Sequence, residues 1–154
     1  MSTTVLQLAR AYMKIASSAK VNDIEFLRQK QTKIDDQQSS SYSQLRKMLT
    51  NVTLSGGTAV KAGVKGYSVA GKTGTSYIAS KNGYDESKYI ASFVGFAPAK
   101  QAKYVIAVVL WEPSFNYRYG GRSAAPIFAD IMQHLLVFKK DNYLLSNDRS
   151  MLYN

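Results

Sequence analysis

GYSVAGKTGT, residues 66–75, is the stretch on which the fold of this 154-residue chain depends. Residues 66–73 fit the phosphate-binding loop pattern, in which a glycine-rich turn lies between a buried strand and a helix. Lys72-Thr73-Gly74 also fits an element that some acyl-transfer enzymes carry on an extended strand. The two patterns require opposite conformations after Lys72, so the neighbouring residues must discriminate between them.

The residues around this stretch favour the extended conformation. From Gly66 to Tyr77 the side chains alternate with the period of two that is typical of a strand. Residues 58–65 do not form the buried strand that a phosphate loop needs before it. Asn82-Gly83 is a turn signal and a poor start for a helix. A strand is therefore the preferred interpretation, and a nucleotide-binding phosphate loop remains the less favoured alternative.

Apolar periodicity along the rest of the chain predicts an α+β fold. Thr4 and Gln7 form a capping-box pattern at the start of the first helix. We expect an antiparallel sheet of about three strands, with helices covering one side of it. The predicted elements are helices over residues 5–16, 45–52 and 126–138, and strands over residues 66–77, 89–97 and 103–111.

The predicted domain covers residues 1–138. It is interrupted by a polar linker at residues 21–44, which includes the cluster of Asp, Gln and Ser at residues 35–41. The last residues, 139–154, are polar and are predicted to form a flexible C-terminal tail.

Composition excludes several classes of protein. The chain has no cysteine, so disulfides and cysteine nucleophiles are excluded. It contains no apolar run of eighteen residues, and residues 1–20 do not resemble a secretory signal. The formal charge of +10 is spread evenly: residues 1–50 carry eight basic and four acidic side chains, and residues 51–154 carry twelve and six. Without a basic block or a base-reading motif, nucleic-acid binding is not expected.

Several segments in fixed order resemble one enzyme family. They match the C-terminal half of the transpeptidase domain of class B penicillin-binding proteins, and within that family the cell-division peptidoglycan D,D-transpeptidases. The resemblance covers residues 1–20 and about 45–138, whereas residues 21–44 depart from the family pattern. The matching segments are residues 3–12, 57–59, 69–76, 89–98, 105–109, 112–113, 119–121 and 124–128.

The resemblance implies roles for the Lys-Thr-Gly strand in a partial penicillin-binding-protein or β-lactamase-like fold. The backbone N–H of Thr75 would be one of two oxyanion donors. The hydroxyls of Thr73 and Thr75 would hold the terminal carboxylate of a D-Ala-D-Ala stem peptide or of a β-lactam. Lys72 would attract that carboxylate and tune the proton relay, and Gly74 would let the backbone approach the ligand. No cofactor or metal is implied.

The same mechanism needs a nucleophilic Ser-x-x-Lys and a Ser-x-Asn element before the Lys-Thr-Gly strand. Residues 17–20 match the first pattern by letters, but they end a helix that the family places after the nucleophile. Residues 80–82 and 114–116 match the second pattern but follow Lys72 in the chain. We therefore expect a truncated transpeptidase domain that begins after its nucleophile and is inactive alone.

This expectation leaves the partner and the location open. A complementary chain could supply the first half of the domain, because a sheet without its outer strands has exposed edges. A non-enzymatic scaffold that uses those edges is the rival interpretation. The resemblance implies the bacterial inner membrane and periplasm, whereas the sequence has no anchor and would be cytoplasmic if expressed alone.

Two further features carry expectations. The single histidine, His134, is expected on the surface of the last helix rather than in catalysis. Arg118 and Arg122, with Tyr117 and Tyr119, belong either to a ligand-facing loop or to a solvated one.

Overall fold

A computed structural model describes residues 3–17, 36–80 and 83–150 of the chain. The elements are helices α1 (Val5–Ala16), α2 (Asp36–Asn51) and α3 (Ala124–Ser150), the short 3₁₀ turns η1 (Val60–Ala62) and η2 (Phe115–Tyr117), and strands β1 (Ala70–Ser80), β2 (Gly83–Ala97) and β3 (Tyr104–Trp111).

The strands form one antiparallel sheet in the order β1-β2-β3. Lys72 lies opposite Val94 on β2, and Phe96 of β2 lies opposite Val105 on β3. Within the described residues β1 pairs on one side only, so its other edge is open. The prediction of about three antiparallel strands is confirmed.

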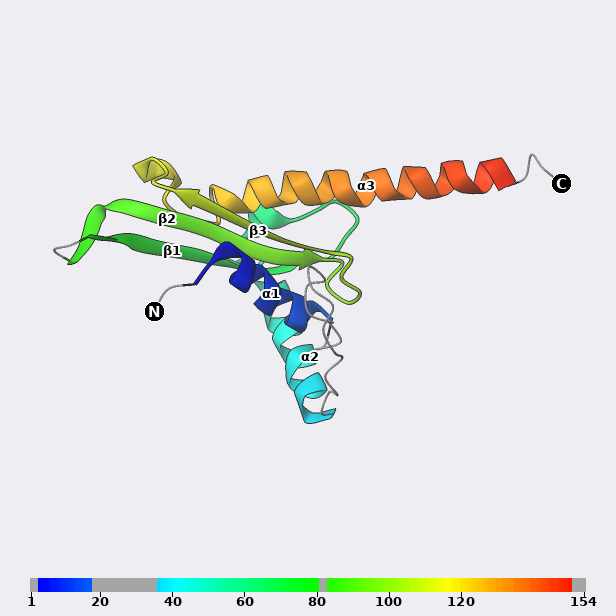
Figure 1. Ribbon diagram of the computed structural model, residues 1–154, viewed down its shortest axis with the longest axis horizontal. Helices are drawn as coiled ribbons and strands as arrows, with labels where there is room; N and C mark the ends of the chain where they lie inside the picture. Colours follow the sequence, from blue (N-terminus) through cyan, green and yellow to red (C-terminus); the bar gives the residue numbers. More distant parts are fainter. Residues whose placement is uncertain (1–2, 18–35, 81–82, 151–154) are drawn as a thin grey trace.

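Helices cover both faces of the sheet, not one face as the sequence suggested (Figure 1). Helix α3 packs on one face, where the rings of Phe93 and Phe128 lie 4.8 Å apart between their centres. Helices α1 and α2 pack on the other face, around Phe96 and Leu49. Because side chains alternate between the faces of a strand, β2 supplies apolar residues to both cores. A sheet with two apolar faces needs a layer on each side.

Helix α1 begins and ends with side-chain hydrogen bonds. Its predicted capping box is confirmed, since Gln7 N donates to Thr4 Oγ1 at 3.2 Å and Thr4 N donates to Gln7 Oε1 at 2.8 Å. At the other end, Arg46 of α2 donates to the carbonyl of Ala16 at 3.2 Å. Burial raises the pKa of Tyr12, which packs with α1 against the second core. These contacts fix α1 on the sheet.

Two boundaries differ from the sequence prediction. Helix α2 begins at Asp36, so residues 36–44 of the predicted linker are helical, and residues 21–35 lie outside the described part. Helix α3 continues to Ser150, so the expected end of the helix at residue 138 is wrong. Polar residues have modest helix propensity, and a helix that is held by tertiary packing can extend through them.

The strands also begin at other residues than expected. β1 starts at Ala70 rather than Gly66, because Val64 and Tyr67 form an isolated bridge just before it. β2 starts at Gly83 rather than Tyr89 and lengthens the hairpin. The chain after Lys72 is extended as far as Ser80, so the helix that a phosphate loop requires is missing there. The nucleotide-binding alternative is therefore wrong.

Candidate functional site

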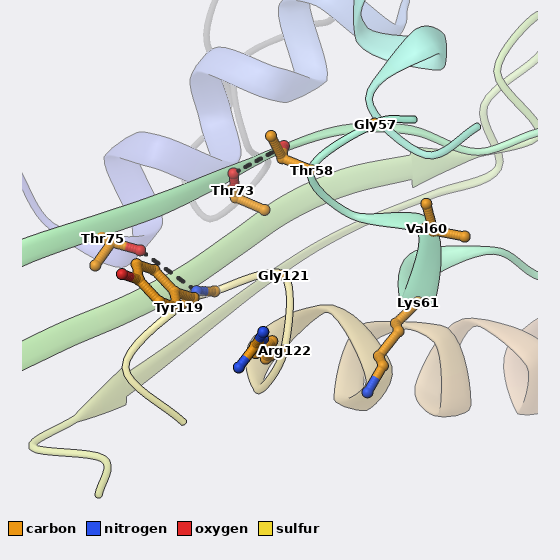
Figure 2. Close-up of a pocket in the computed structure, with 10 residues that line it drawn as sticks. Gly57, Thr58, Val60, Lys61, Thr73, Thr75, Tyr119, Gly121 and Arg122 are labelled. Atoms are coloured by element: carbon orange, nitrogen blue, oxygen red, sulfur yellow. Dashed lines mark hydrogen bonds between the residues drawn. The ribbon is translucent and has the colours of Figure 1, made fainter. Parts of the chain in front are cut away.

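A cleft of about 440 Å³ opens beside β1 on the face that α3 covers (Figure 2). One wall is β1, and the others are the segment around η1 and the loop that leads into α3. The lining residues are Gly57, Thr58, Val60, Lys61, Thr73, Thr75, Tyr119, Gly120, Gly121 and Arg122.

The structure brings Thr73 and Thr75 into this cleft and leaves Lys72 and Gly74 out of its lining. The separation follows from the strand, since neighbouring residues point to opposite faces. Lys72 nevertheless reaches back to its neighbour, and its Nζ donates to the carbonyl of Thr73 at 3.2 Å and to Thr73 Oγ1 at 3.4 Å. The ammonium charge therefore lies next to a hydroxyl of the cleft.

Thr73 also contacts a second threonine across the cleft. Its Oγ1 lies 3.2 Å from Thr58 Oγ1, a hydrogen bond in which either hydroxyl can be the donor. An ammonium group can only donate, so the bond from Lys72 uses Thr73 Oγ1 as an acceptor. One proton of the threonine pair is left to point into the cleft, and the pair can bind an anionic oxygen.

Thr75 is oriented by the loop before α3. The N–H of Gly120 donates to Thr75 Oγ1 over 3.4 Å (Figure 2). Because a hydroxyl oxygen that accepts one bond still carries its own proton, Thr75 can donate into the cleft. Thr73 and Thr75 thus form a row of hydroxyl groups along one wall.

Two glycines let this loop lie directly on the sheet, at Gly120, and on the segment before η1, at Gly121. A Cβ atom on Gly120 would lie 2.0 Å from the carbonyl oxygen of Ser92, and a Cβ on Gly121 would lie 2.0 Å from that of Thr58. Such distances do not occur, so only glycine fits at either position. The resemblance had marked these residues without giving them a role, since the signal of a close backbone approach is not visible in the sequence.

Gly74 has a packing reason of its own. A Cβ atom there would lie 2.4 Å from Ser92 Oγ on the neighbouring strand. The expectation that Gly74 lets the backbone approach a ligand stays a prediction, and the side chain of Ser92 gives glycine at this position a separate packing reason. Gly74 therefore leaves room for the side chain of Ser92, its direct partner on β2.

The wall opposite β1 carries two cations. Lys61 belongs to η1, and Arg122 lies just before α3. No aspartate or glutamate is among the lining residues, so the cleft has a positive electrostatic character. Sequence reasoning had weighed Arg122 as ligand-facing but had missed Lys61, which no motif distinguishes from other surface lysines.

A second hollow of about 370 Å³ adjoins Thr75 on its other side. The guanidinium carbon of Arg118 lies 3.8 Å from the ring centre of Phe115, 4.4 Å from that of Tyr119 and 5.9 Å from that of Tyr89. The guanidinium nitrogens of Arg118 also donate hydrogen bonds, to the carbonyl of Phe115 at 2.8 Å and to the hydroxyl of Tyr119 at 3.0 Å. This cluster of aromatic rings around one cation stiffens the loop. Tyr117, in contrast, is exposed and lines neither hollow.

The other candidates lie away from the cleft. Ser17 Oγ donates to the carbonyl of Met13 at 2.8 Å as the cap of α1, and residues 18–20 lie outside the described part. His134 is exposed on α3, and its Nδ1 lies 2.7 Å from the carbonyl oxygen of Asp130. The expected surface position of His134 is confirmed.

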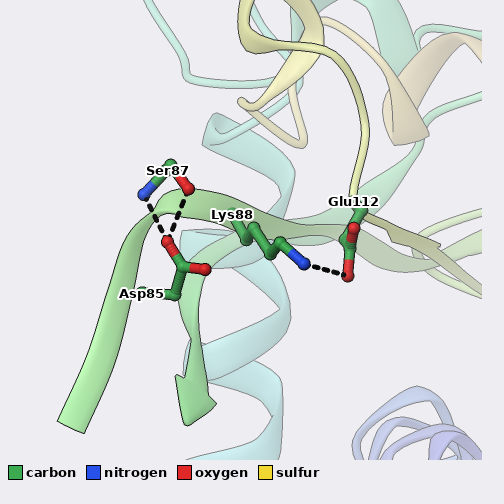
Figure 3. A network of polar contacts seen from close by, with 4 residues as sticks. All are labelled: Asp85, Ser87, Lys88 and Glu112. Carbon is green, nitrogen blue, oxygen red and sulfur yellow. Dashed lines mark hydrogen bonds and ion pairs between the residues drawn. The ribbon is translucent and has the colours of Figure 1, made fainter. Parts of the chain in front are cut away.

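A polar network lies farther along the hairpin (Figure 3). Hydrogen bonds from the side chain and backbone of Ser87 lower the pKa of the Asp85 carboxyl. Lys88 Nζ lies 3.5 Å from Glu112 Oε1, so these charges pair across the sheet. None of these four residues lines the cleft, so they offer no catalytic group to it.

No group of three or more His, Cys, Asp or Glu side chains in the described ranges could hold a metal ion. Within the same ranges, every helix is too short or too polar to cross a bilayer.

Comparison with curated proteins identifies relatives. The chain is 34% identical over 131 residues to a probable peptidoglycan D,D-transpeptidase PenA from Neisseria flavescens, covering 84% of this chain and 33% of the relative. It is 36% identical over 140 residues to the peptidoglycan D,D-transpeptidase FtsI of Escherichia coli K12, covering 86% of this chain and 23% of the relative. The chain thus spans about a third or less of the length of these relatives.

Solved structures agree in fold. The transpeptidase domain of penicillin-binding protein 3 from Burkholderia pseudomallei superposes with a TM-score of 0.69 at 35% identity, over 87% of this chain and 42% of that one. Penicillin-binding protein 3 of Mycobacterium tuberculosis gives a TM-score of 0.66 at 29% identity, over 90% and 36%. The model of the penicillin-binding protein transpeptidase domain matches residues 1–133. This chain therefore belongs to the penicillin-binding protein transpeptidase family, and its fold is part of the fold of that domain.

Proposed function

We propose that this chain forms the substrate-binding side of a peptidoglycan D,D-transpeptidase domain. The observation that carries the proposal is the row of threonine hydroxyls on the open edge strand, with the Lys72 ammonium beside it. The names of the relatives support the reaction class, since they are D,D-transpeptidases. Transpeptidation would take place where peptidoglycan lies, on the periplasmic side of a bacterial inner membrane.

Carboxylate recognition is the first task of this wall. A ligand that ends in D-Ala-D-Ala, or a β-lactam, carries a terminal carboxylate. Thr73 and Thr75 would each donate a hydroxyl proton to it, and Lys72 would add positive charge. Hydrogen bonds to a charged group are shorter and stronger than neutral ones. The bonds from Lys72 and Gly120 hold both hydroxyls in place before the ligand arrives, which lowers the entropic cost of binding.

Oxyanion stabilisation is the second task. Acyl transfer places negative charge on the carbonyl oxygen that is attacked, and a preorganised N–H lowers the energy of that state. The Thr75 N–H on the edge strand would be one such donor. Gly120 and the aromatic cluster at Arg118 hold the loop against β1. The strand would therefore keep its shape as negative charge develops on the carbonyl oxygen.

The nucleophile would come from the other half of the domain, on a segment that carries Ser-x-x-Lys. Its serine would attack the D-Ala-D-Ala carbonyl, release the terminal D-Ala and form an acyl-enzyme, which an amine then resolves. A complementary polypeptide could supply this segment. In that case the chain alone binds ligands and does not turn them over.

Labelling with fluorescent penicillin tests whether the nucleophile lies outside this chain. We expect no covalent adduct on the purified chain, because the Lys72 ammonium donates to Thr73 Oγ1 and the Gly120 N–H donates to Thr75 Oγ1, so neither hydroxyl donates to a base that could activate it. A stable adduct on Ser17 would overturn the proposal, since it would place the nucleophile inside this chain.

Ligand titration tests the binding wall. N-acetyl-D-Ala-D-Ala should shift the amide NMR signals of residues 73–75, whereas the same peptide with a C-terminal amide should not. Lys72→Ala should weaken the carboxylate ligand by about tenfold or more, the effect of one charge-assisted hydrogen bond. Lys65→Ala is the matched control, because Lys65 is exposed and does not line the cleft. Equal binding of the acid and the amide would contradict the proposed role of this wall.

A further inference from the structure

The sheet has two open edges that differ in how they are protected. Within the described residues, β1 and β3 each pair with β2 alone, so the outer side of both strands lacks a partner strand. Natural proteins interrupt such edges with charged residues, prolines or irregular register, because an unpaired row of backbone groups binds other strands. β1 follows this rule, since it carries Lys72 and its register with β2 shifts between Tyr77 and Ile78. β1 is therefore protected against continuous pairing with another chain.

β3 has none of these protections. Its eight residues, YVIAVVLW, contain no charge, proline or glycine, and its register with β2 runs without a shift. Helices cover both faces of the sheet, yet of these eight residues only Val108 is buried, whereas the central strand β2 is buried from Phe93 to Ala97. Trp111, at the end of β3, is 65% exposed. An apolar edge strand with this exposure is expected to pair with another strand.

The direction of the backbone groups of β3 follows from one hydrogen bond. The N–H of Glu112 donates to the carbonyl of Tyr89 at 2.9 Å, so the backbone groups of Glu112 face β2. Because successive residues of an antiparallel strand direct these groups to alternate sides, four residues of β3 direct their N–H and C=O to the open edge. They are Val105, Ala107, Val109 and Trp111. Each of the four can donate and accept one hydrogen bond there.

We propose that β3 is a dimerisation strand, which pairs antiparallel with β3 of a second copy of this chain. A two-fold axis at Val108 places Val105 opposite Trp111 of the second copy, and Ala107 opposite Val109. In this register all four edge-facing residues exchange hydrogen bonds, and the two three-stranded sheets join into one. A contact of this symmetry closes on itself, so the assembly stops at a dimer. The inference does not rest on the proposed function, because β3 and the cleft lie at opposite edges of the sheet.

The residues at and around β3 make a second copy the partner that fits. Lys103 precedes the strand and Glu112 follows it, so antiparallel pairing of two copies brings opposite charges together at both ends. Glu112 Oε1 already lies 3.5 Å from Lys88 Nζ, but both side chains are exposed, and a pair of this kind is weak enough to share the carboxylate. Between the ends, Trp111 would lie opposite Val105, and an aromatic ring opposite a β-branched residue stabilises a sheet. The surface is thus complementary to itself.

Sedimentation equilibrium of the full chain tests the association. A single pair of strands is a small interface, so we expect a weak dimer with a dissociation constant of about 10–100 µM. Trp111 is the only tryptophan of the chain. Because pairing shields its ring from water, its fluorescence should shift to shorter wavelength over the same range of concentration. A chain that stays monomeric throughout, or a dimer that forms without this shift, overturns the proposal.

Trp111→Lys tests the strand itself. Position 111 is exposed, so the variant should keep its fold, which circular dichroism checks. In the dimer the new ammonium group would lie beside Val105 and diagonally from Lys103 of the second copy, and we expect the dissociation constant to rise about tenfold or more. Tyr84→Lys is the matched control, because it makes the same exchange at an aromatic residue of β2 that is 74% exposed. Equal effects in both variants, or none in Trp111→Lys, would overturn the assignment of the interface to β3.

Engineered cysteines test the register, since the chain has no cysteine of its own. Directly opposite residues that exchange hydrogen bonds lie about 5.5 Å apart between their Cα atoms, a distance that a disulfide can bridge. The double variant Val105→Cys/Trp111→Cys should therefore form covalent dimers in a glutathione redox buffer, and each single variant should not. Absence of covalent dimers in the double variant, or their formation by Ala107→Cys alone, would overturn the register centred on Val108.

Discussion

The β1–β2 hairpin has two ends that differ in almost every respect. At the inner end Phe93 and Ala70 are fully buried, and helices cover both faces. At the outer end Tyr84 is 74% exposed, and the short polar contacts between Ser87 and Asp85 lie within β2 itself. The cleft lies between them, at Thr73 and Thr75. The rigid end therefore fixes the geometry of the site, and the outer end leaves it accessible.

The largest loss of stability should follow a substitution at the inner end of the hairpin. Phe93→Ala removes a ring that packs against Phe128, so we expect a loss of about 3–5 kcal/mol in the free energy of unfolding. Tyr84→Ala at the outer end should stay within about 0.5 kcal/mol. Urea unfolding followed by circular dichroism measures both. Comparable losses would mean that the outer end is packed as firmly as the core.

The next largest loss of stability should follow a substitution in the loop that crosses the hairpin. Gly120→Ala forces a methyl group against the Ser92 carbonyl, and we expect a loss of about 1–3 kcal/mol together with weaker ligand binding. Gly63→Ala is the control, because its Cβ would meet only the Val60 carbonyl oxygen, at 3.3 Å. Thermal unfolding and the N-acetyl-D-Ala-D-Ala titration report the two quantities. An unchanged affinity in Gly120→Ala would show that the loop does not position Thr75.

A smaller effect is expected where the loop meets the outer half of the hairpin. Arg118→Ala removes a guanidinium from between aromatic rings and should cost about 1 kcal/mol. Arg118→Lys keeps the charge but loses the planar group that donates to Tyr119, so it should rescue only part of that loss. Full rescue by lysine would mean that charge alone, rather than stacking, holds the loop.

The smallest effect belongs to Asp85, at the outer end. Its pKa is lowered by the hydrogen bonds from Ser87, so the ionised form is favoured in the folded chain. The resulting stabilisation is present above the pKa of the unfolded chain and is lost as the pH falls through the folded value. NMR titration should find the Asp85 pKa below its ordinary value and raised in Ser87→Ala. No change in that variant would assign the shift to another cause.

Patterns among neighbouring residues in the sequence predicted most of the elements of the fold. The period of two around Lys72, the capping box at Thr4 and the β-branched runs of the last two strands predicted the main elements, because each depends on neighbours in the chain. The face on which the helices pack could not be predicted from these patterns. It depends on which residues of β2 meet α1, α2 or α3, and those contacts join segments that are distant in sequence.

The site was predictable only in part. The Lys-Thr-Gly segment identified the strand, and its alternation put Thr73 and Thr75 on one face. Thr58 and Lys61 were not identified as site residues, because they reach the cleft only after the chain has folded back across β1. The requirement for glycine at position 120 could not be predicted either, because it depends on the close approach of a carbonyl of β2.

The two glycines that hold the loop against β2 and against Thr58 have a consequence for how this cleft can change over evolution. The backbone is anchored at Gly120 and Gly121, while the flanking side chains at Arg118 and Arg122 extend away from the anchor. Exchanges at Arg122 can alter which ligands are admitted without shifting the strand beneath, whereas exchanges at Arg118 would also loosen the aromatic cluster of the loop. Ligand preference can therefore drift between relatives while the shape of the binding wall is inherited unchanged.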